Sequence, residues 1–203
     1  MTVFARTALV LFLSSSALAI PGTAMAQDAS SDDQNIFFFG GRFTDMFFEY
    51  SFNPIAVGYE NNFVLGGGYQ HFLLDTPFGV RLGAEVGTSL RFGDSDPSGE
   101  IWGGVVARYD DLLQADHFTV NLAATVGLSA TTGTVGIERD REIDEDGDSS
   151  LLWYFGPEVS ITPRDNPNLE FFWRLQHRSG GWESLGNMRD GANANTVGVR
   201  LKF

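Results

Sequence analysis

Two residues near the C-terminal end of the chain, His177 and Ser179, have the types and the spacing of a catalytic base and its nucleophile. On a β-strand, side chains two residues apart point to the same face, and their backbones are about 6.5–7 Å apart. A histidine in that position can reach a serine hydroxyl and remove its proton, which activates the oxygen for acyl transfer. The pair is therefore a candidate for nucleophilic catalysis.

The segment that carries this pair alternates between apolar and polar residues, as expected of a strand with two different faces. The same alternation recurs along the chain and predicts eight strands, at about residues 36–43, 61–73, 78–92, 99–109, 117–129, 151–162, 168–178 and 193–203. Most of these exceed the usual globular strand and match the roughly 9–11 residues that cross a bilayer at a tilt.

The predicted connections alternate between long polar loops and short turns. The long ones cover residues 44–60, 93–98, 130–150 and 179–192, and the short ones lie around 75–77, 110–116 and 163–167. Outer-membrane barrels have this asymmetry, with short periplasmic turns and longer outer loops. We therefore expect an eight-stranded antiparallel transmembrane β-barrel.

Charged residues in the predicted strands fall on the face opposite the apolar residues. They are Arg42, Arg81, Glu85, Arg108, Glu158, Glu170, Arg174, Arg178, Arg200 and Lys202. Because eight strands enclose an interior just wide enough for side chains, we expect a filled, charged lumen rather than a conducting pore. A soluble lipocalin-like barrel would have the reverse arrangement, an apolar interior and a charged exterior.

The first 26 residues have the pattern of a secretory signal peptide. Arg6 precedes a short apolar stretch, and the segment ends in Ala24-Met25-Ala26. We expect cleavage before Gln27, which leaves residues 27–203 as a single barrel domain exported to the outer membrane of a Gram-negative bacterium.

Charge and composition exclude several other classes of function. The 203 residues include 13 basic and 26 acidic side chains and no cysteine. The net charge of −13 argues against nucleic acid as a partner, and the lack of cysteine excludes disulfides and thiolate metal sites. We expect no cofactor. An acidic stretch, 138–148, resembles a calcium loop, but aligning Gly147 with the invariant glycine puts Trp153 where a glutamate is required. We therefore expect a solvated outer loop and no calcium-loop metal site; weak divalent-cation binding near lipopolysaccharide phosphates is the alternative that the sequence leaves open.

The parity of the seventh predicted strand puts His177 and Ser179 on the lipid-facing surface, near its outer end. Asn193 and Asn195 occupy the same surface on the last strand, which should pair with the seventh. An ionisable side chain facing lipid is by default a functional hypothesis. The alternative is that His177 is simply wetted by head groups, because the penalty near the interface is only about 0–1 kcal/mol.

The C-terminal part of the chain resembles a known family. His177-x-Ser179, then Asp190-Gly191 and a final strand ending in the bulky Phe203, are similar to PagL-type lipid A 3-O-deacylases. The resemblance is specific over about the last 36 residues. It implies an outer-membrane barrel that removes an ester-linked acyl chain from lipid A, using a His–Ser–Glu triad on its outer surface. Ser179 would then be the nucleophile and His177 the base.

The chain departs from this family at two positions. Asn193 occupies the place of the acidic triad member, and Gly180 follows the serine where the family commonly has asparagine. Asparagine orients a histidine but does not stabilise an imidazolium as a carboxylate does. Glu183 and Asp190 are alternative acids, and the amides around Gly180 and Gly181 are candidate oxyanion donors.

Two functions therefore remain open from the sequence. The first is an esterase that acts on lipid A of lipopolysaccharide in the outer leaflet. The second is a non-catalytic barrel with a structural or adhesive role, including a degenerate relative of the deacylases. An outward-facing site would also leave lipid-facing surface free for a homodimer.

Overall fold

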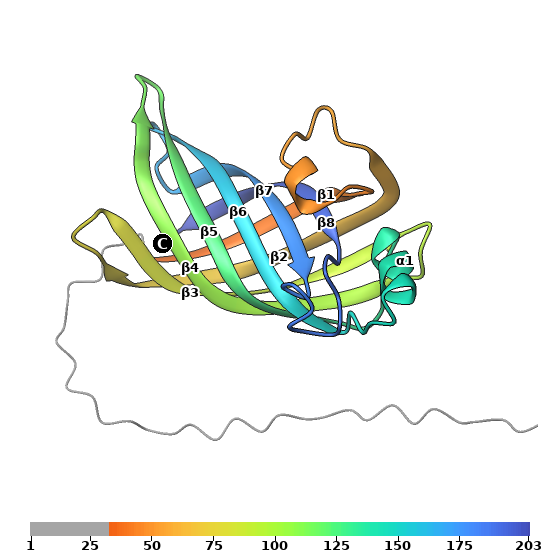
Figure 1. Cartoon of the computed structure of the whole chain (residues 1–203). Helices are drawn as coiled ribbons and strands as arrows, with labels where there is room; N and C mark the ends of the chain where they lie inside the picture. Colours follow the sequence, from red (N-terminus) through yellow and green to blue (C-terminus); the bar gives the residue numbers. More distant parts are fainter. Residues whose placement is uncertain (1–32) are drawn as a thin grey trace, which may run out of the picture.

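A computed structural model describes residues 33–203, so the predicted signal peptide lies outside the described residues. Eight antiparallel strands form a closed barrel in sequence order, with β1 and β8 paired (Figure 1). The strands are β1 (Gln34–Thr44), β2 (Tyr59–Asp75), β3 (Val80–Gly93), β4 (Ser98–Gln114), β5 (Phe118–Thr131), β6 (Leu151–Pro163), β7 (Leu169–Ser179) and β8 (Asn193–Lys202). The predicted architecture is confirmed.

The long connections gather at one end of the barrel. The β1–β2 loop contains the short helix η1 (Phe48–Tyr50), and the β5–β6 loop contains helix α1 (Ile137–Asp144). These loops and the β7–β8 loop lie at the end opposite the C-terminus (Figure 1). The predicted long connections are found between β1 and β2, β5 and β6, and β7 and β8. The predicted long loop at 93–98 was wrong, because only residues 94–97 separate β3 from β4, as few as in the β2–β3 turn at 76–79. The largest boundary error is in β4, which extends to Gln114, into the segment that was predicted as a turn.

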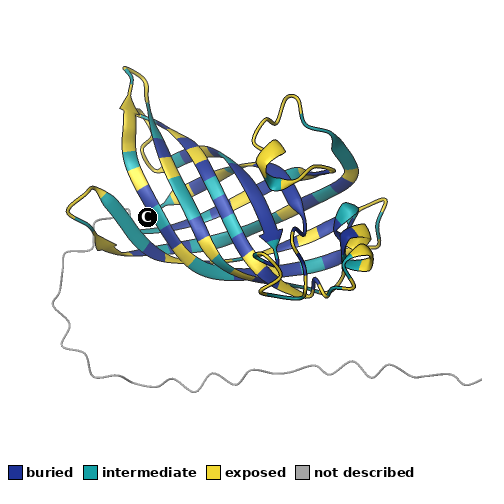
Figure 2. Ribbon diagram, in the orientation of Figure 1, coloured by how far each residue is buried: buried dark blue, intermediate teal, exposed yellow. Residues whose placement is uncertain are grey.

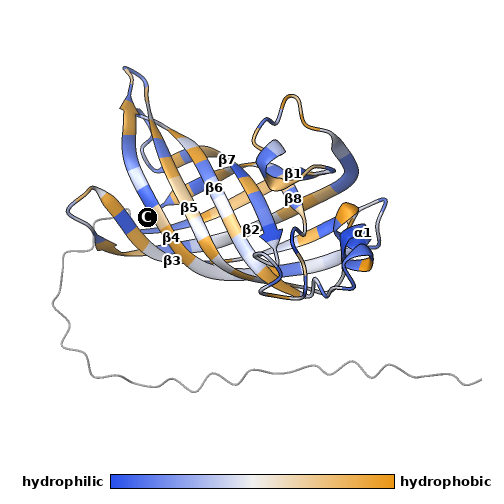
Figure 3. Ribbon diagram, viewed as in Figure 1, coloured by the Kyte–Doolittle hydropathy of each residue, from blue (hydrophilic) through white to orange (hydrophobic). Residues whose placement is uncertain are grey.

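The outer wall of the barrel is apolar. Large hydrophobic side chains are exposed on all sides of it, among them Phe38, Leu65, Ile101, Val126 and Val197, and exposed and buried positions alternate along each strand (Figures 2 and 3). Because the barrel is closed, no strand edge leaves its backbone groups unpaired. A closed barrel with an apolar outer band is one of the two structures that can span a lipid bilayer.

No helix in the described part of the chain is long and apolar enough to cross a membrane.

The lumen contains a chain of buried ion pairs. Arg174 contacts Glu85 at 2.7 Å and Glu158 at 2.8 Å, and Arg200 joins Glu158 to Glu170. Arg108 continues the network from Glu170, at 2.5 Å. The predicted charged lumen is confirmed for these residues. Arg42 is the exception, because the parity of β1 points its side chain outward, with Phe38, while Phe37 and Phe39 point inward.

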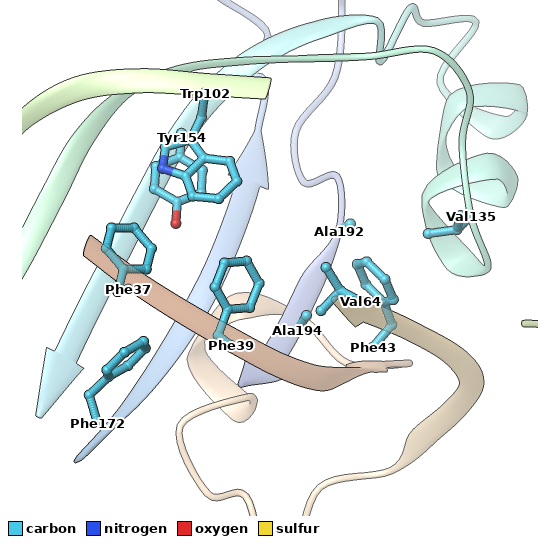
Figure 4. Close-up of a cluster of buried hydrophobic side chains, with 10 residues drawn as sticks. All are labelled: Phe37, Phe39, Phe43, Val64, Trp102, Val135, Tyr154, Phe172, Ala192 and Ala194. Atoms are coloured by element: carbon cyan, nitrogen blue, oxygen red, sulfur yellow. The ribbon is translucent and has the colours of Figure 1, made fainter. Parts of the chain in front are cut away.

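The lumen also holds aromatic rings, which the alternation of charged residues did not reveal. Trp102 and Tyr154 stack with their ring centroids 5.3 Å apart, and Phe37 and Phe172 pack edge to face at 6.0 Å (Figure 4). The indole Nε1 of Trp102 donates to Glu85 at 2.8 Å. Rings and ion pairs together fill the interior.

The acidic stretch is not a wholly solvated loop, contrary to the prediction. It forms α1, and Glu138 of this helix is fully buried at the outer end of the lumen, bonded to Arg91 and Arg178. The physical reason is charge pairing: the buried Arg91 and Arg178 require a carboxylate, and within the described residues the only strand carboxylate that forms an ion pair with either of them is Glu100, 3.5 Å from Arg178.

Candidate functional site

His177 and Asn193 face each other across the outer ends of β7 and β8. The two residues are register partners, and Leu175 pairs with Asn195 one step further into the barrel wall. The sequence predicted this proximity from parity alone. The predicted lipid exposure of His177 was wrong, however: the side chain points outward but the residue is 9% exposed, and Leu175 is completely buried.

The cover is the β1–β2 loop, residues 45–58, which we call the lid. The ring of Phe48 lies 4.3 Å from the imidazole of His177, and Phe52 lies 6.5 Å from Trp173. Asn195 donates from Nδ2 to the backbone oxygen of Ser51 at 3.1 Å, which ties the lid to β8. The lid therefore lies against the outer wall over β7 and β8 (Figure 1).

This loop was expected to be polar, and Phe48 was not singled out. The signal was present in the sequence, because Met46-Phe47-Phe48, Tyr50 and Phe52 concentrate apolar and aromatic residues where a solvated loop would be polar. Phe48 and Phe52 pack on the outer wall, against Phe155 of β6 and Trp173 of β7.

Hydrogen bonds orient the imidazole. His177 Nδ1 lies 2.7 Å from Asn193 Oδ1. Asn193 Nδ2 donates to the backbone oxygen of Met46 at 3.0 Å and to Asp190 Oδ2 at 3.4 Å. Both partners of Nδ2 are acceptors, so the amide oxygen must face the histidine and accept from Nδ1–H. In this tautomer Nε2 carries the lone pair, as a general base requires.

Asp190 is the carboxylate at this site. Its Oδ1 lies 3.5 Å from His177 Nδ1, and it is largely buried. Glu183, the other predicted acid, lies on the exposed surface and pairs with Arg189 at 3.0 Å. The structure therefore brings Asp190 and Asn193 to the histidine together and leaves Glu183 outside the cluster.

Arg141 of α1 holds this carboxylate and was not predicted. Its Nη1 lies 3.3 Å from Asp190 Oδ2 and donates to the backbone oxygen of Gly191 at 2.6 Å. Its Nη2 donates to the backbone oxygen of Met46 at 3.3 Å. One side chain thus joins α1, the β7–β8 loop and the lid. Arg141 lies in a highly charged stretch of the sequence, and nothing in that stretch distinguishes it from its exposed neighbours.

Ser179 lies at the end of β7, paired with Trp153 of β6 and partly exposed. Within residues 33–203 its hydroxyl makes no hydrogen bond, so the His177–Ser179 bond of an assembled triad is not formed. The amides of Gly180 and Gly181 donate no hydrogen bond within the same residues; Gly180 is buried and Gly181 is partly exposed. The loop continues through Trp182 and Glu183 with φ values of 56° and 67°, a left-handed conformation that is uncommon for such residues.

In chemical terms, the site offers a hydroxyl, an oriented imidazole, a buried carboxylate and two unused amides on the outer wall of the barrel. Among residues 33–203, no group of three or more histidine, aspartate or glutamate side chains is placed to hold a metal ion.

Comparison with known proteins identifies similar folds. No protein-family model matches the chain, and no curated protein matches its sequence. The crystal structure of Neisserial surface protein A (NspA) is similar with a TM-score of 0.52 and 14% identity, covering 86% of this chain and 98% of that one. The outer membrane enzyme PagL matches with a TM-score of 0.49 and 16% identity, over 83% of this chain and 99% of that one.

The N-terminal β-barrel domain of Pseudomonas aeruginosa OprF matches with a TM-score of 0.45 and 15% identity, over 85% of this chain and 98% of that one. At these identities the similarity to NspA concerns the fold, not the activity. The closed fold and the apolar outer wall described above are those of an eight-stranded outer-membrane barrel.

Proposed function

We propose that the protein is an outer-membrane serine esterase that removes an ester-linked acyl chain from lipid A. The observation that carries this proposal is the orientation of His177, whose Nδ1 is held by Asn193 and approached by Asp190 while Ser179 follows on the same face of β7. The order of groups, carboxylate to imidazole to hydroxyl, is that of a hydrolytic triad.

The reaction would proceed through an acyl-enzyme. His177 Nε2 takes the proton of Ser179 as Oγ attacks the ester carbonyl, and the amides of Gly180 and Gly181 stabilise the oxyanion. The tetrahedral intermediate collapses with cleavage of the ester C–O bond, and the imidazolium returns the proton to the leaving sugar oxygen. Water then repeats the sequence on the acyl-serine and releases the fatty acid.

Two residues share the role of the acidic triad member, which orients the histidine and stabilises the imidazolium. Asn193 fixes the tautomer through its 2.7 Å bond, and Asp190, at 3.5 Å, supplies the negative charge that the amide lacks. A carboxylate that is close to the imidazolium without a short hydrogen bond still stabilises it in a partly buried site, because the local dielectric constant is lower than in water.

The location of the site favours a lipid substrate. His177 and Ser179 lie on the outside of the barrel, at the end that carries the long loops, which in outer-membrane barrels faces the outer leaflet. The covering lid presents Met46, Phe47, Tyr50 and Ile55 as exposed apolar side chains. An acyl chain can therefore approach through the membrane without an internal pocket.

Mass spectrometry of lipid A tests this function. The wild type, His177→Ala, Ser179→Ala and a control, Ser150→Ala, are produced in cells whose lipid A carries ester-linked 3-hydroxyacyl chains. Ser150 is an exposed serine of the β5–β6 loop and lies outside the site. We expect loss of one acyl chain with the wild type and the control, and a fall of about 10³-fold or more with either site variant, since triad members act as a unit.

The non-catalytic alternative is favoured by specific features of the same site. The hydroxyl of Ser179 is not bonded to His177, Phe48 packs on the imidazole, and the position expected to be acidic is Asn193. Intact lipid A in cells that contain correctly folded wild-type protein would favour this alternative and exclude the esterase.

A further inference from the structure

Arg42 is an arginine on the outward side of the barrel wall. It pairs with Asn195 of β8 and with Phe63 of β2, and it is exposed. The other strand arginines and Lys202 have the inward parity of the lumen residues. Within residues 33–203, Arg42 is therefore the only Arg or Lys on the outward face of a strand.

The guanidinium of Arg42 lies over aromatic rings and forms no ion pair within the described residues. It lies 5.6 Å from the ring centroid of Tyr59 and 5.5 Å from that of Phe63. Its Nε donates to the backbone oxygen of Glu60 at 2.5 Å. Among residues 33–203 no carboxylate forms an ion pair with it, and its two Nη groups make no hydrogen bond. In contrast, the lumen arginines Arg174 and Arg200 are each paired with two glutamates.

The surroundings of Arg42 indicate the depth at which it lies in the membrane. Tyr59 and Phe63 belong to the outer end of β2, and Phe63 packs at 6.0 Å from Phe92 at the outer end of β3. Aromatic residues at the ends of barrel strands form the girdle at the level of the lipid head groups. The two Nη groups of Arg42, which make no hydrogen bond within residues 33–203, therefore lie at the level of the outer-leaflet head groups.

We infer that Arg42, Tyr59 and Phe63 form a binding site for the phosphate group of an outer-leaflet lipid. A guanidinium that contacts two rings and is fixed through Nε has its two Nη groups left to donate to phosphate oxygens, which accept such bonds in pairs. The protein carries a net charge of −13, so an anion is drawn to this position by local contacts and not by the overall field.

This site uses none of the side chains that the proposed hydrolysis requires. It borders the lid, however: Arg42 pairs with Asn195, which bonds to the lid at Ser51. The hydroxyl of Tyr59 also donates to the backbone oxygen of Pro54 in the lid. Binding of a lipid phosphate at Arg42 does not require an intact Ser179.

Native mass spectrometry of the purified barrel in detergent tests the inference. All proteins carry Ser179→Ala so that added lipid A is not consumed. The background protein is compared with variants that also carry Arg42→Gln, Arg42→Lys or, as a control, Arg139→Gln. Arg139 is an exposed arginine of α1 whose loss changes the net charge equally. The probes are lipid A and a glycolipid of similar size without phosphate, each with and without excess inorganic phosphate.

We expect the fraction of barrel that retains lipid A to fall about tenfold with Arg42→Gln, as for the loss of one charge-assisted hydrogen-bonded contact, and less with Arg42→Lys. The control should retain lipid A like the background protein, and the glycolipid without phosphate should bind all variants equally weakly. Equal retention by Arg42→Gln and the background protein would overturn the inference. Complete displacement of lipid A by millimolar inorganic phosphate would also overturn it, because the ligand would then be the free anion.

Discussion

The lumen and the outer-wall site both bury charged and polar side chains, but they satisfy them differently. In the lumen, Arg174 and Arg200 each contact two carboxylates. At the outer wall, the hydroxyl of Ser179 has no partner in the described residues, and Asp190 Oδ1 accepts no hydrogen bond although it lies 3.5 Å from His177 Nδ1. In the lumen these arginines have opposite charges within 3 Å, even though a single atom such as Arg200 Nε makes no hydrogen bond within residues 33–203. The outer-wall site leaves a hydroxyl and a carboxylate oxygen without a hydrogen bond in the same part of the chain.

The groups that stabilise this barrel are therefore distinct from the groups that are available for a reaction. A buried ion-pair network resists change because removing one member leaves its partners charged and unpaired. A reactive site needs the opposite condition, since a nucleophile and its oxyanion donors must be free to bind substrate. The same elements supply both: β7 carries Arg174 into the lumen and His177 to the outer wall, by the alternation of a single strand.

The largest effect is expected in the lumen. Arg174→Met leaves Glu85 and Glu158 without their shared cation, and we expect the free energy of unfolding to fall by about 3–5 kcal/mol. Urea titration of the folded barrel in lipid vesicles measures this quantity. The matched outer-wall change, Asn193→Ala, should cost less, about 1–3 kcal/mol, because it leaves the neutral partners of a buried amide unsatisfied and not two charged ones. Equal losses would remove the distinction between the two regions.

Asp190→Asn should separate activity from stability at the outer wall. It preserves the size of the side chain and removes the charge next to His177. We expect deacylation to slow by about 100-fold, or about 2.7 kcal/mol in activation free energy. Glu183→Gln is the control, because Glu183 pairs with Arg189 on the exposed surface. If Glu183→Gln slows the reaction more than Asp190→Asn, the assignment of the acid is wrong.

Arg141→Gln should have a smaller effect, since Arg141 acts on the site through Asp190 and the lid. We expect a decrease of about tenfold in kcat, as for the loss of one charged hydrogen-bonding contact, with little change in KM. Arg141→Lys should restore part of the rate. A purely structural role would instead lower the amount of folded barrel in both variants and leave the rate per folded molecule unchanged.

The smallest effect is expected in the lid. Phe48→Ala removes the ring that covers the imidazole, and it should raise the rate about threefold by increasing the population with an accessible His177. Ile55→Ala, at a fully exposed position of the same loop, is the control and should change little. A large loss of activity with Phe48→Ala would show that Phe48 helps to bind substrate and does not merely cover the site.

Much of the fold and part of the site could be predicted from the sequence. Period-two alternation predicted the eight strands and the side of the wall on which His177, Ser179, Asn193 and Arg174 lie, because parity is a local property of an extended chain. It failed locally at Arg42. It also missed the aromatic rings of the lumen, because a small barrel accepts either ion pairs or rings in its interior.

The tertiary structure decided what covers and surrounds each group. That Phe48 packs on His177, that Asp190 rather than Glu183 reaches the imidazole, and that Arg141 and Glu138 turn inward from an acidic stretch all depend on how three outer loops meet. Loop conformation follows from long-range packing and charge pairing, for which the sequence has no periodic signal. The strands and their faces were therefore determined by the sequence itself, and the partners of each site residue were determined by the closed barrel that brings the loops together.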